Sequence, residues 1–372
     1  MKILTINWQD ISNPQAGGAE IHLEEIMKRI AKRGNHVTLF CSSYPGAKRI
    51  ERRDGLKIIR KGSRYNFNLV AFSVFPSLLR QEKPDLVIED INKIPFYLPL
   101  LHNLPTLIII PHLFADSVFQ EINYIMGLYI FLSEKPIRRI YRNKDFLVIS
   151  ESTKIDLVKR NIPAENVQVI KCGIEHSLYK PNQEVPRDKN PLALYVGRIK
   201  KYKSIDLLID AFSLVSKKIP EAYLAIVGDG DYASQLKQRV RGLKLDKKVV
   251  FTGYVSLEEK LRWLRRAWVS VYPSLKEGWG LTNIEANACG TPVLASDVPG
   301  LKDSVKAGES GFLFPYGDSK KLSELMLDLF TKRKLREKLS EGGLRWAKNF
   351  SWDKAALETM ILIENIIGKR WS

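Results

Sequence analysis

Two carboxylates and a glycine-rich loop occur together in the second half of the 372-residue chain. Glu277 opens the loop, and Glu285 lies in the helix predicted after it. Gly278 and Gly280 let the backbone approach a ligand closely, and the free N–H groups of a helix starting near Leu281 form a site for phosphate. The carboxylates can accept hydrogen bonds from sugar or ribose hydroxyl groups. The alternative is a solvated loop acid and an ordinary helix residue. The small and apolar neighbours of the second carboxylate argue against that alternative, because a buried acid needs a partner.

Two cations follow the first predicted strand of the second half. Arg198 and Lys203 come shortly after the apolar run 192–196. A guanidinium group can bind two phosphate oxygens and an ammonium group adds a point charge, so the pair can neutralise a diphosphate without a divalent ion. Lys200 and Lys201 lie beside them, so a solvated basic loop is the alternative.

Two weaker candidates lie in the first half. Gly17 and Gly18 stand between the first predicted strand and helix, where backbone amides can bind an anion, although a plain tight turn explains them equally well. His112 follows the apolar run 106–110 and could contact a reacting sugar or an acceptor. A single histidine is more often structural.

The elements that must position these residues alternate along the whole chain. Short apolar runs bounded by turn residues separate amphipathic segments, which is typical of buried parallel strands and helices in an α/β fold. The predicted strands are 2–7, 36–41, 56–60, 85–89, 106–110, 145–149 and 167–171, and then 192–196, 222–227, 248–252, 268–272, 292–295 and 312–314. The predicted helices of the second series are 204–218, 231–242, 256–266, 281–289, 319–330 and 333–347. The polar stretch 181–188 reads as an interdomain linker. Because such sheets bind ligands beyond the carboxyl ends of their strands, we expect a shared site in a central cleft.

Size, charge and cysteine content narrow the class of protein. The length fits two domains, and 45% hydrophobic and 27% charged residues are typical of a soluble globular chain. A formal charge of +18 favours an anionic partner such as a nucleotide, a nucleic acid or an acidic membrane. Cys41, Cys172 and Cys289 are odd in number and widely spaced, which predicts neither a disulfide framework nor a zinc site. We therefore expect a cytoplasmic protein.

Taken together, these segments resemble the family 4 glycosyltransferases of the GT-B fold. The resemblance is carried by Gly-Gly-Ala-Glu at 17–20, by Gly197-Arg198 with Lys203 five residues after the arginine, and by Glu277 and Glu285 with seven residues between them. It implies two Rossmann-like parallel-sheet domains facing a central cleft. Residues 1–175 would bind the acceptor and 176–350 the nucleotide sugar, and a helix within 351–372 would cross back to the first domain.

The resemblance also implies a role for each candidate residue. The catalytic residues would be His112, Arg198, Lys203 and Glu277. The donor-binding residues would be Gly17, Gly18, Arg198, Lys203, Gly253, Tyr254, Val255, Glu277, Gly278, Trp279, Gly280, Leu281 and Glu285. Among these, the two cations would hold the diphosphate, the first glutamate the donor sugar and the second the ribose, while 253–255 would border the nucleobase.

The implied reaction is retaining transfer of a hexose, of the glucose or mannose type, from a nucleoside diphosphate sugar to a glycan or a lipid-linked acceptor. The leaving phosphate helps to deprotonate the acceptor in such a reaction, so neither a protein nucleophile nor a metal or other cofactor is expected. A phosphorylase would need a lysine that binds pyridoxal phosphate, for which the sequence offers no candidate segment. Two further alternatives stay open. One is a sugar-nucleotide epimerase of the same fold. The other is a basic nucleic-acid-binding protein, for which the sequence contains no recognised module, so a nucleic-acid partner is not expected.

Two basic clusters in the first half suggest a membrane-facing surface. The first consists of Lys48, Arg49, Arg52, Arg53, Lys57, Arg60, Lys61 and Arg64, and the second of Lys135, Arg138, Arg139, Arg142 and Lys144. The second cluster follows an apolar run that ends at Leu132. Cations beside exposed apolar side chains suit an acidic membrane or a lipid-phosphate-linked acceptor, which would place the protein on the inner face of the cell membrane. The alternative is a solvated basic face over an ordinary core helix.

Overall fold

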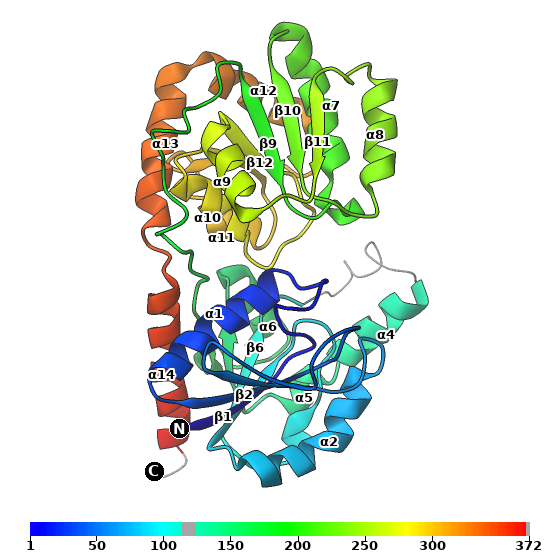
Figure 1. The fold of residues 1–372 in the computed structure, drawn as a ribbon, viewed down its shortest axis with the longest axis vertical. Coiled ribbons are helices and arrows are strands. Elements are labelled where there is room, and N and C mark those ends of the chain that lie inside the picture. The colour runs from blue at the N-terminus through cyan, green and yellow to red at the C-terminus, as the bar shows by residue number, and fades with distance from the viewer. Residues whose placement is uncertain (114–123, 370–372) are drawn as a thin grey trace. The chain divides into compact units, whose positions relative to one another are not determined.

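The computed structural model describes residues 1–113 and 124–369. The chain forms two compact units, each with its own sheet (Figure 1). Unit 1 consists of Met1–Gly173 and Trp352–Ser372, and unit 2 consists of Ile174–Ser351. The chain therefore leaves unit 1 once and returns to it for its last helix.

The described part of unit 1 contains an eight-stranded sheet. Across the sheet the strands are β3 (Ile50–Arg53), β4 (Leu56–Arg60), β2 (His36–Cys41), β1 (Lys2–Ile6), β5 (Leu86–Asp90), β6 (Thr106–Ile110), β7 (Asp145–Val148) and β8 (Val167–Val169). All neighbours are parallel except β3 and β4, which pair antiparallel. The order reverses at β1, because β2 lies on one side of it and β5 on the other. The carboxyl ends of β1 and β5 therefore flank a topological switch point, where such sheets bind ligands.

The helices in the described part of unit 1 have few residue ranges predicted from the sequence. They are α1 (Gly18–Lys32), α2 (Phe67–Glu82), α4 (Tyr124–Glu134), α5 (Ile137–Ile140), α6 (Glu151–Lys159) and α14 (Trp352–Gly368), with short turns η1 (Leu98–Leu100) and η3 (Ala164–Asn166). No range was predicted for α2, α4 or α5, and α2 carries Pro76 within it, a residue that usually interrupts helices. No helix in the described ranges is both long and apolar enough to cross a bilayer.

Unit 2 contains a six-stranded parallel sheet. Its order is β11 (Val249–Gly253), β10 (Tyr223–Val227), β9 (Leu192–Val196), β12 (Val269–Tyr272), β13 (Val293–Ser296) and β14 (Gly311–Phe314). The helices are η4 (Lys201–Lys203), α7 (Ile205–Lys218), α8 (Ala233–Gly242), α9 (Leu257–Arg266), α10 (Leu281–Ala288), α11 (Leu301–Ser304), α12 (Ser319–Thr331) and α13 (Arg333–Ala347). The strand order reverses between β9 and β12, so unit 2 has its own switch point there.

The predicted strands all occur, within two residues of their expected ends, because buried parallel strands read as short apolar runs. The strand that the sequence missed is β3, a charged edge strand with the sequence Ile-Glu-Arg-Arg. Edge strands tolerate charge on both faces and so lack the apolar signal.

The segment 181–188, predicted as an interdomain linker, instead belongs to unit 2. The Arg187 guanidinium donates to the backbone carbonyls of Gly290 and Ala267. The Trp268 indole N–H donates to the Asp188 carbonyl over 2.8 Å. These contacts hold the segment against the body of unit 2, so its polar composition reflects local pairing rather than a free connection.

The last helix, α14, packs against α1 within unit 1. Arg29 Nε donates to the Asp353 carboxylate over 2.8 Å, and the ring centroids of His22 and Trp352 lie 6.1 Å apart. His22 is fully buried, and neither ring nitrogen has a hydrogen-bond partner within the described structure. Burial disfavours the charged imidazolium and lowers the pKa of His22 to about 4.

This histidine makes the stability of unit 1 sensitive to acid. The unfolded chain binds a proton near pH 6.5 and the folded chain does not, so stability falls as the pH drops from 6.5 towards 4. Between pH 7 and 5 the free energy of unfolding should fall by about 2 kcal/mol because of His22, and we expect this fall to be absent in His22→Phe. Urea unfolding at both pH values, with hydrogen exchange in α1 and α14, measures it. The exposed His36 provides the control, and an equal pH response in His22→Phe and His36→Gln would contradict the prediction.

Candidate active site

The loops after β9 and β12 carry the strongest candidates, and these two strands flank the switch point of unit 2. Arg198 follows β9 directly, and its side chain is exposed. The Tyr195 hydroxyl donates to the Arg198 carbonyl over 2.9 Å and holds the turn. The guanidinium group is therefore presented to solvent by a fixed backbone.

Lys203 and Glu277 form an ion pair between these two loops. The ammonium group donates to Glu277 Oε1, and the two side chains are only 15% and 20% exposed. Burial alone would lower the pKa of Lys203, but the neighbouring carboxylate outweighs it and raises the pKa above its ordinary value. The Leu275 N–H also donates to the Tyr202 carbonyl over 2.9 Å, so the loops are joined through both side chain and backbone.

Two glycines bring further backbone against these loops. A Cβ on Gly228 would lie 2.0 Å from the Gly197 carbonyl oxygen, and a Cβ on Gly300 would lie 2.0 Å from the Glu277 carbonyl oxygen. Both glycines also have positive φ angles, +133° and +82°. No other residue fits either position, so both loops rest on glycine backbone. The sequence reasoning did not assign a role to Gly300, whose signal is a Pro-Gly turn after β13.

The glycine-rich loop ends at the start of α10. Gly280 precedes the helix with φ +98°, and Leu281 is its first residue. The N–H groups of this first turn lie beside the Glu277 loop and are suited to bind an anion. Trp279 is 3% exposed and packs against Phe350, with ring centroids 5.5 Å apart. Its side chain therefore anchors the loop, and only its backbone can contribute to a binding surface.

Glu285 lies one turn further along α10 and is paired. Its Oε2 is 2.7 Å from Lys260 Nζ, which also donates to the Tyr179 hydroxyl over 3.1 Å. Burial and the neighbouring Glu285 charge raise the pKa of Tyr179. Sequence reasoning missed Lys260 and Tyr179, because neither belongs to a motif and they lie far from Glu285 in the chain.

The segment 253–255 follows β11. Gly253 accepts a 2.9 Å hydrogen bond from the Gly228 N–H, and Tyr254 is 90% exposed. Val255 packs partly against the core of unit 2. The backbone is thus fixed while the tyrosine ring projects into solvent.

Gly17 and Gly18 lie in unit 1, at the start of α1. The Gly17 N–H donates to Glu20 Oε2 over 2.7 Å, and Asn92 Nδ2 donates to Glu20 Oε1 over 2.9 Å. The loop after β1 is therefore tied to the loop after β5. One amide of the predicted anion site already has a carboxylate partner.

The carboxyl end of β5 carries two buried acids that sequence reasoning did not assign. Glu89 accepts hydrogen bonds from the Phe96 N–H and the Tyr141 hydroxyl over 2.7 and 2.6 Å. Burial raises the pKa of Glu89 to about 7. Asp90 is fully buried, and within the described structure neither carboxylate oxygen has a hydrogen-bond partner. Burial, with the nearby Glu20, raises the pKa of Asp90 well above its ordinary value. The sequence feature that could have identified them is a pair of consecutive acids at the end of an apolar strand.

His112 lies two residues beyond β6 in unit 1 and is half-buried. The preceding Pro111 carbonyl accepts a 3.1 Å hydrogen bond from the Thr153 hydroxyl at the start of α6. The next residue, Leu113, is part of the core. The turn that carries the histidine is therefore held from both sides, while Phe114 lies outside the described residues.

The prediction that the first basic cluster faces a membrane is wrong for Arg53, Lys57 and Arg60. Arg60 is fully buried and donates to the Asp10 carboxylate over 2.7 and 3.0 Å. Arg53 pairs with Glu24, and Lys57 pairs with Glu82. The reason is strand periodicity, because Arg60 shares the inward face of β4 with Leu56 and Ile58.

This buried pair holds the loop that leads to Gly17. Burial alone would raise the pKa of Asp10, but the Arg60 guanidinium lowers it below its ordinary value. Asp10 also accepts from the Ser12 N–H over 2.9 Å. Arg60 thus positions the loop after β1 from inside unit 1.

Two family models match this chain, one in each half. The model described as Glycosyltransferase Family 4 matches residues 16–178, and the model described as Glycosyl transferases group 1 matches residues 179–346. The chain belongs to the family 4 glycosyltransferases. This glycosyltransferase has the GT-B fold, and it resembles sucrose-phosphate synthase from Thermosynechococcus elongatus with a TM-score of 0.85 and 23% identity, over 99% of both chains. It also resembles the Anabaena protein HepE, solved with UDP and glucose, with a TM-score of 0.80 and 18% identity, over 98% of this chain and 100% of HepE.

Curated relatives differ in how much of their length the chain matches. A mannosylfructose-phosphate synthase of Agrobacterium fabrum is 29% identical over 60% of this chain and 54% of its own length. A D-inositol 3-phosphate glycosyltransferase of Thermomonospora curvata is 32% identical over 51% of this chain and 49% of its own length. The chain thus spans about half of these two relatives. An uncharacterized glycosyltransferase of Methanocaldococcus jannaschii is 24% identical over 98% of this chain and 99% of its own length.

We expect Arg60→Gln to destabilise unit 1 of this glycosyltransferase by about 3 kcal/mol, because it removes the two hydrogen bonds to the buried Asp10 carboxylate and leaves only the more distant Arg53, at 3.6 Å, as its charge partner. Urea unfolding with hydrogen exchange in the loop 7–17 measures the effect. The matched control is Arg52→Gln on the neighbouring strand β3, where the side chain is exposed. Its effect should stay within about 0.5 kcal/mol. Equal stability of the two variants would show that Arg60 does not support the loop.

Proposed function

We propose that this glycosyltransferase moves a hexose, of the glucose or mannose type, from a nucleoside diphosphate sugar to an acceptor with retention of configuration. The observation that carries the proposal is the Lys203–Glu277 ion pair at the switch point of unit 2. It joins a cation suited to phosphate and a carboxylate suited to sugar hydroxyl groups on two adjacent loops. A diphosphate-linked sugar needs both kinds of partner within a short distance.

The cations would act on the leaving group. Arg198 can bind two phosphate oxygens, and Lys203 adds a second positive charge. The first-turn amides of α10, beginning at Leu281, would add dipoles aimed at the same anion. We propose that these groups stabilise the departing diphosphate without a metal ion, and that the protein contributes through positioning and electrostatics rather than a nucleophile.

Glu277 and Glu285 would orient the donor. The Lys203 contact fixes the Glu277 carboxylate, whose remaining acceptor positions suit the hydroxyl groups of the donor sugar. The Lys260 contact does the same for Glu285, which we propose binds the ribose. The exposed Tyr254 would border the nucleobase.

Unit 1 would supply the acceptor side. We propose that Gly17, Gly18 and His112 contact the donor phosphate, the reacting sugar or the acceptor hydroxyl, and that the acceptor is a glycan or a lipid-linked molecule. The names of two curated relatives contain mannosylfructose phosphate and D-inositol 3-phosphate, which are polar, hydroxyl-bearing molecules, and this supports a polar acceptor here. We also propose that the enzyme works in the cytoplasm at the inner face of an acidic membrane, to which the exposed cations Lys135, Arg138 and Arg139 would contribute attraction.

Release of nucleoside diphosphate from a panel of UDP-, GDP- and ADP-sugars, with EDTA present, tests the reaction. Release that depends on an added acceptor supports transfer without a metal. An epimerase of the same fold would instead convert the donor into an isomer. Restoration of activity only by a divalent ion would overturn the metal-independent part of the proposal.

We expect Lys203→Gln and Glu277→Gln to lower kcat on the active donor about a hundredfold or more, because each removes a preorganised charge. The matched control is Lys200→Gln, since Lys200 lies in the same basic loop but pairs with the exposed Asp231. That variant should keep kcat within about threefold, as expected for a surface ion pair worth less than 1 kcal/mol. Comparable losses in all three variants would show a general charge effect rather than a site.

A further inference from the structure

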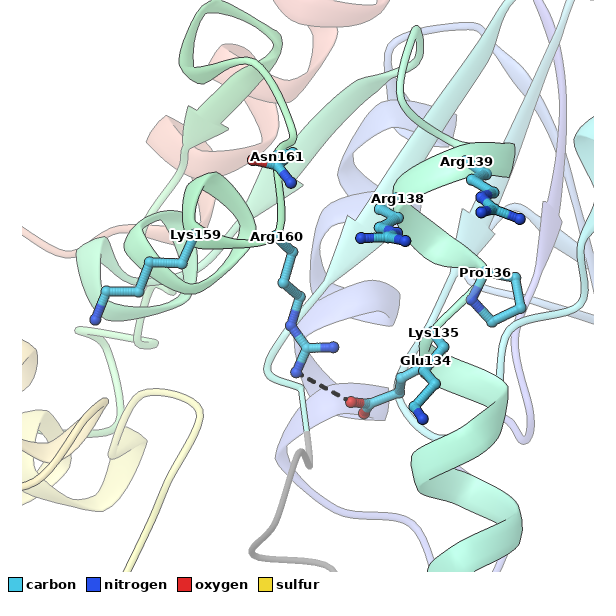
Figure 2. Close-up of a pocket in the computed structure, with 8 residues that line it drawn as sticks. All are labelled: Glu134, Lys135, Pro136, Arg138, Arg139, Lys159, Arg160 and Asn161. Atoms are coloured by element: carbon cyan, nitrogen blue, oxygen red, sulfur yellow. Dashed lines mark ion pairs between the residues drawn. The ribbon is translucent and has the colours of Figure 1, made fainter.

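A basic cavity lies in unit 1, and its lining contains none of the residues proposed above for donor or acceptor (Figure 2). Its volume is about 640 Å³, and its charged lining consists of Glu134, Lys135, Arg138, Arg139, Lys159 and Arg160. These side chains come from the end of α4, from α5 and from the end of α6. Tertiary structure brings the two segments together, because they are separated by a strand and a helix in the chain.

The lining has five cations and one carboxylate. Glu134 is 2% exposed and pairs with Arg160, with 3.3 Å between their charged atoms. Lys135, Arg138, Arg139 and Lys159 form no ion pair with a carboxylate anywhere in the described chain. Four unneutralised cations around one cavity favour an anionic ligand, and arginine favours phosphate oxygens in particular.

An apolar surface leads directly into the basic cavity. Ile125, Leu128, Tyr129 and Leu132 are exposed and recur at helical spacing along one face of α4. Tyr124 and Met126, which flank that face at the start of the helix, are exposed as well. At helical spacing Leu128, Leu132 and Lys135 follow one another on the same face, so the stripe ends at a cation that lines the cavity. A contiguous group of exposed apolar side chains has a cost in water and is typical of an interaction site.

Helix α2 extends the apolar surface. Its Asn68 side chain donates to the Tyr129 hydroxyl over 2.8 Å, which joins α2 to α4. Leu69 is 70% exposed and Phe72 is 40% exposed on the same helix. The result is an apolar surface on two linked helices with cations at its edge, which is the pattern of a protein surface that enters a membrane interface.

We propose that the basic cavity binds the phosphate group of an anionic lipid headgroup, while the exposed face of α4 lies in the interfacial region of the same membrane. The apolar stripe favours a lipid as the ligand over a soluble phosphate ester, because binding of a soluble ligand would leave the stripe exposed to water. It also decides against nucleic acid, whose backbone needs an extended basic track rather than a single cavity beside apolar side chains. The inference rests on the proposed function only in that a lipid-linked acceptor requires the enzyme to reach a membrane.

Vesicle co-sedimentation of the full chain tests the proposal without donor or acceptor. One set of vesicles contains phosphatidylcholine alone, and the other also contains phosphatidylglycerol. We expect the wild type to bind the anionic set, and the double variant Arg138→Gln/Arg139→Gln to bind it about thirtyfold more weakly. The matched control, Lys334→Gln/Lys338→Gln, removes two exposed cations from α13 in unit 2 and should bind like the wild type.

A second pair of variants tests the apolar stripe. Ile125→Ser should weaken binding to anionic vesicles at least about fivefold, because its side chain is 80% exposed and available for insertion. Ile361→Ser on α14, where the side chain is 48% exposed, is the control and should have no effect. Equal effects of the two substitutions would remove α4 from the proposal.

Three results would overturn the proposed site. They are equal binding to both sets of vesicles, equal losses in the two double variants, and binding of inorganic phosphate by the wild type without any binding to vesicles. The last would assign the cavity to a soluble phosphate. Donor turnover without vesicles should stay within twofold in Arg138→Gln/Arg139→Gln. A wild type that binds vesicles but turns over no donor would refute the proposed transfer while leaving the lipid site intact.

Discussion

Parallel strand pairing decides where this glycosyltransferase can place its chemistry. In the parallel part of each sheet the carboxyl ends of the strands lie at one edge, and the reversal of strand order leaves an opening beside β1 and β5 in unit 1 and beside β9 and β12 in unit 2. The loops that leave these ends carry the charged groups of the candidate site. Arg198 and Glu277 are far apart in the chain but follow neighbouring strands, so the sheet alone brings their loops together.

Charge pairing then determines which of the many cations remain available. Lys203, Lys260 and Arg60 are each held by a carboxylate, and each of these pairs links separate loops or elements. A partly buried charge needs such a partner, so these contacts orient the side chains as well as satisfy them. By contrast, Arg198 and the cations of the basic cavity other than Arg160 are presented towards solvent. Some cations of this chain, whose formal net charge is +18, therefore stabilise the fold through ion pairs, and others lie on surfaces that anionic ligands can reach.

The two units use glycine and buried acid in different ways near their switch points. In unit 2, Gly228 and Gly300 let neighbouring backbone approach the Arg198 and Glu277 loops, where any side chain would collide. In unit 1, Glu20 and Glu89 accept backbone N–H groups and tie the ends of β1 and β5 to their surroundings. Asp90 stands out because it is buried at the same edge without a hydrogen-bond partner in the described structure. Rigid loops in both units suit a reaction in which positioning is the main contribution of the protein.

The sequence by itself determined the strands except β3, the helices of unit 2 except the short α11 and η4, and the family. Buried parallel strands and amphipathic helices leave apolar patterns that depend only on local spacing, and the motifs around Arg198, Lys203, Glu277 and Glu285 are short enough to read directly. The charged edge strand β3 lacks such a pattern, so local reasoning missed it. Helix α2 has apolar residues at helical spacing, but Pro76 within it argues against a helix. Only the tertiary structure decided which charges meet. It buried Arg60 against Asp10, paired Lys203 with Glu277 and Lys260 with Glu285, and gathered the cations of the basic cavity from two distant segments. The physical reason is that an ion pair or a cavity depends on distance in space, and the strand order that sets this distance leaves no local trace in the chain.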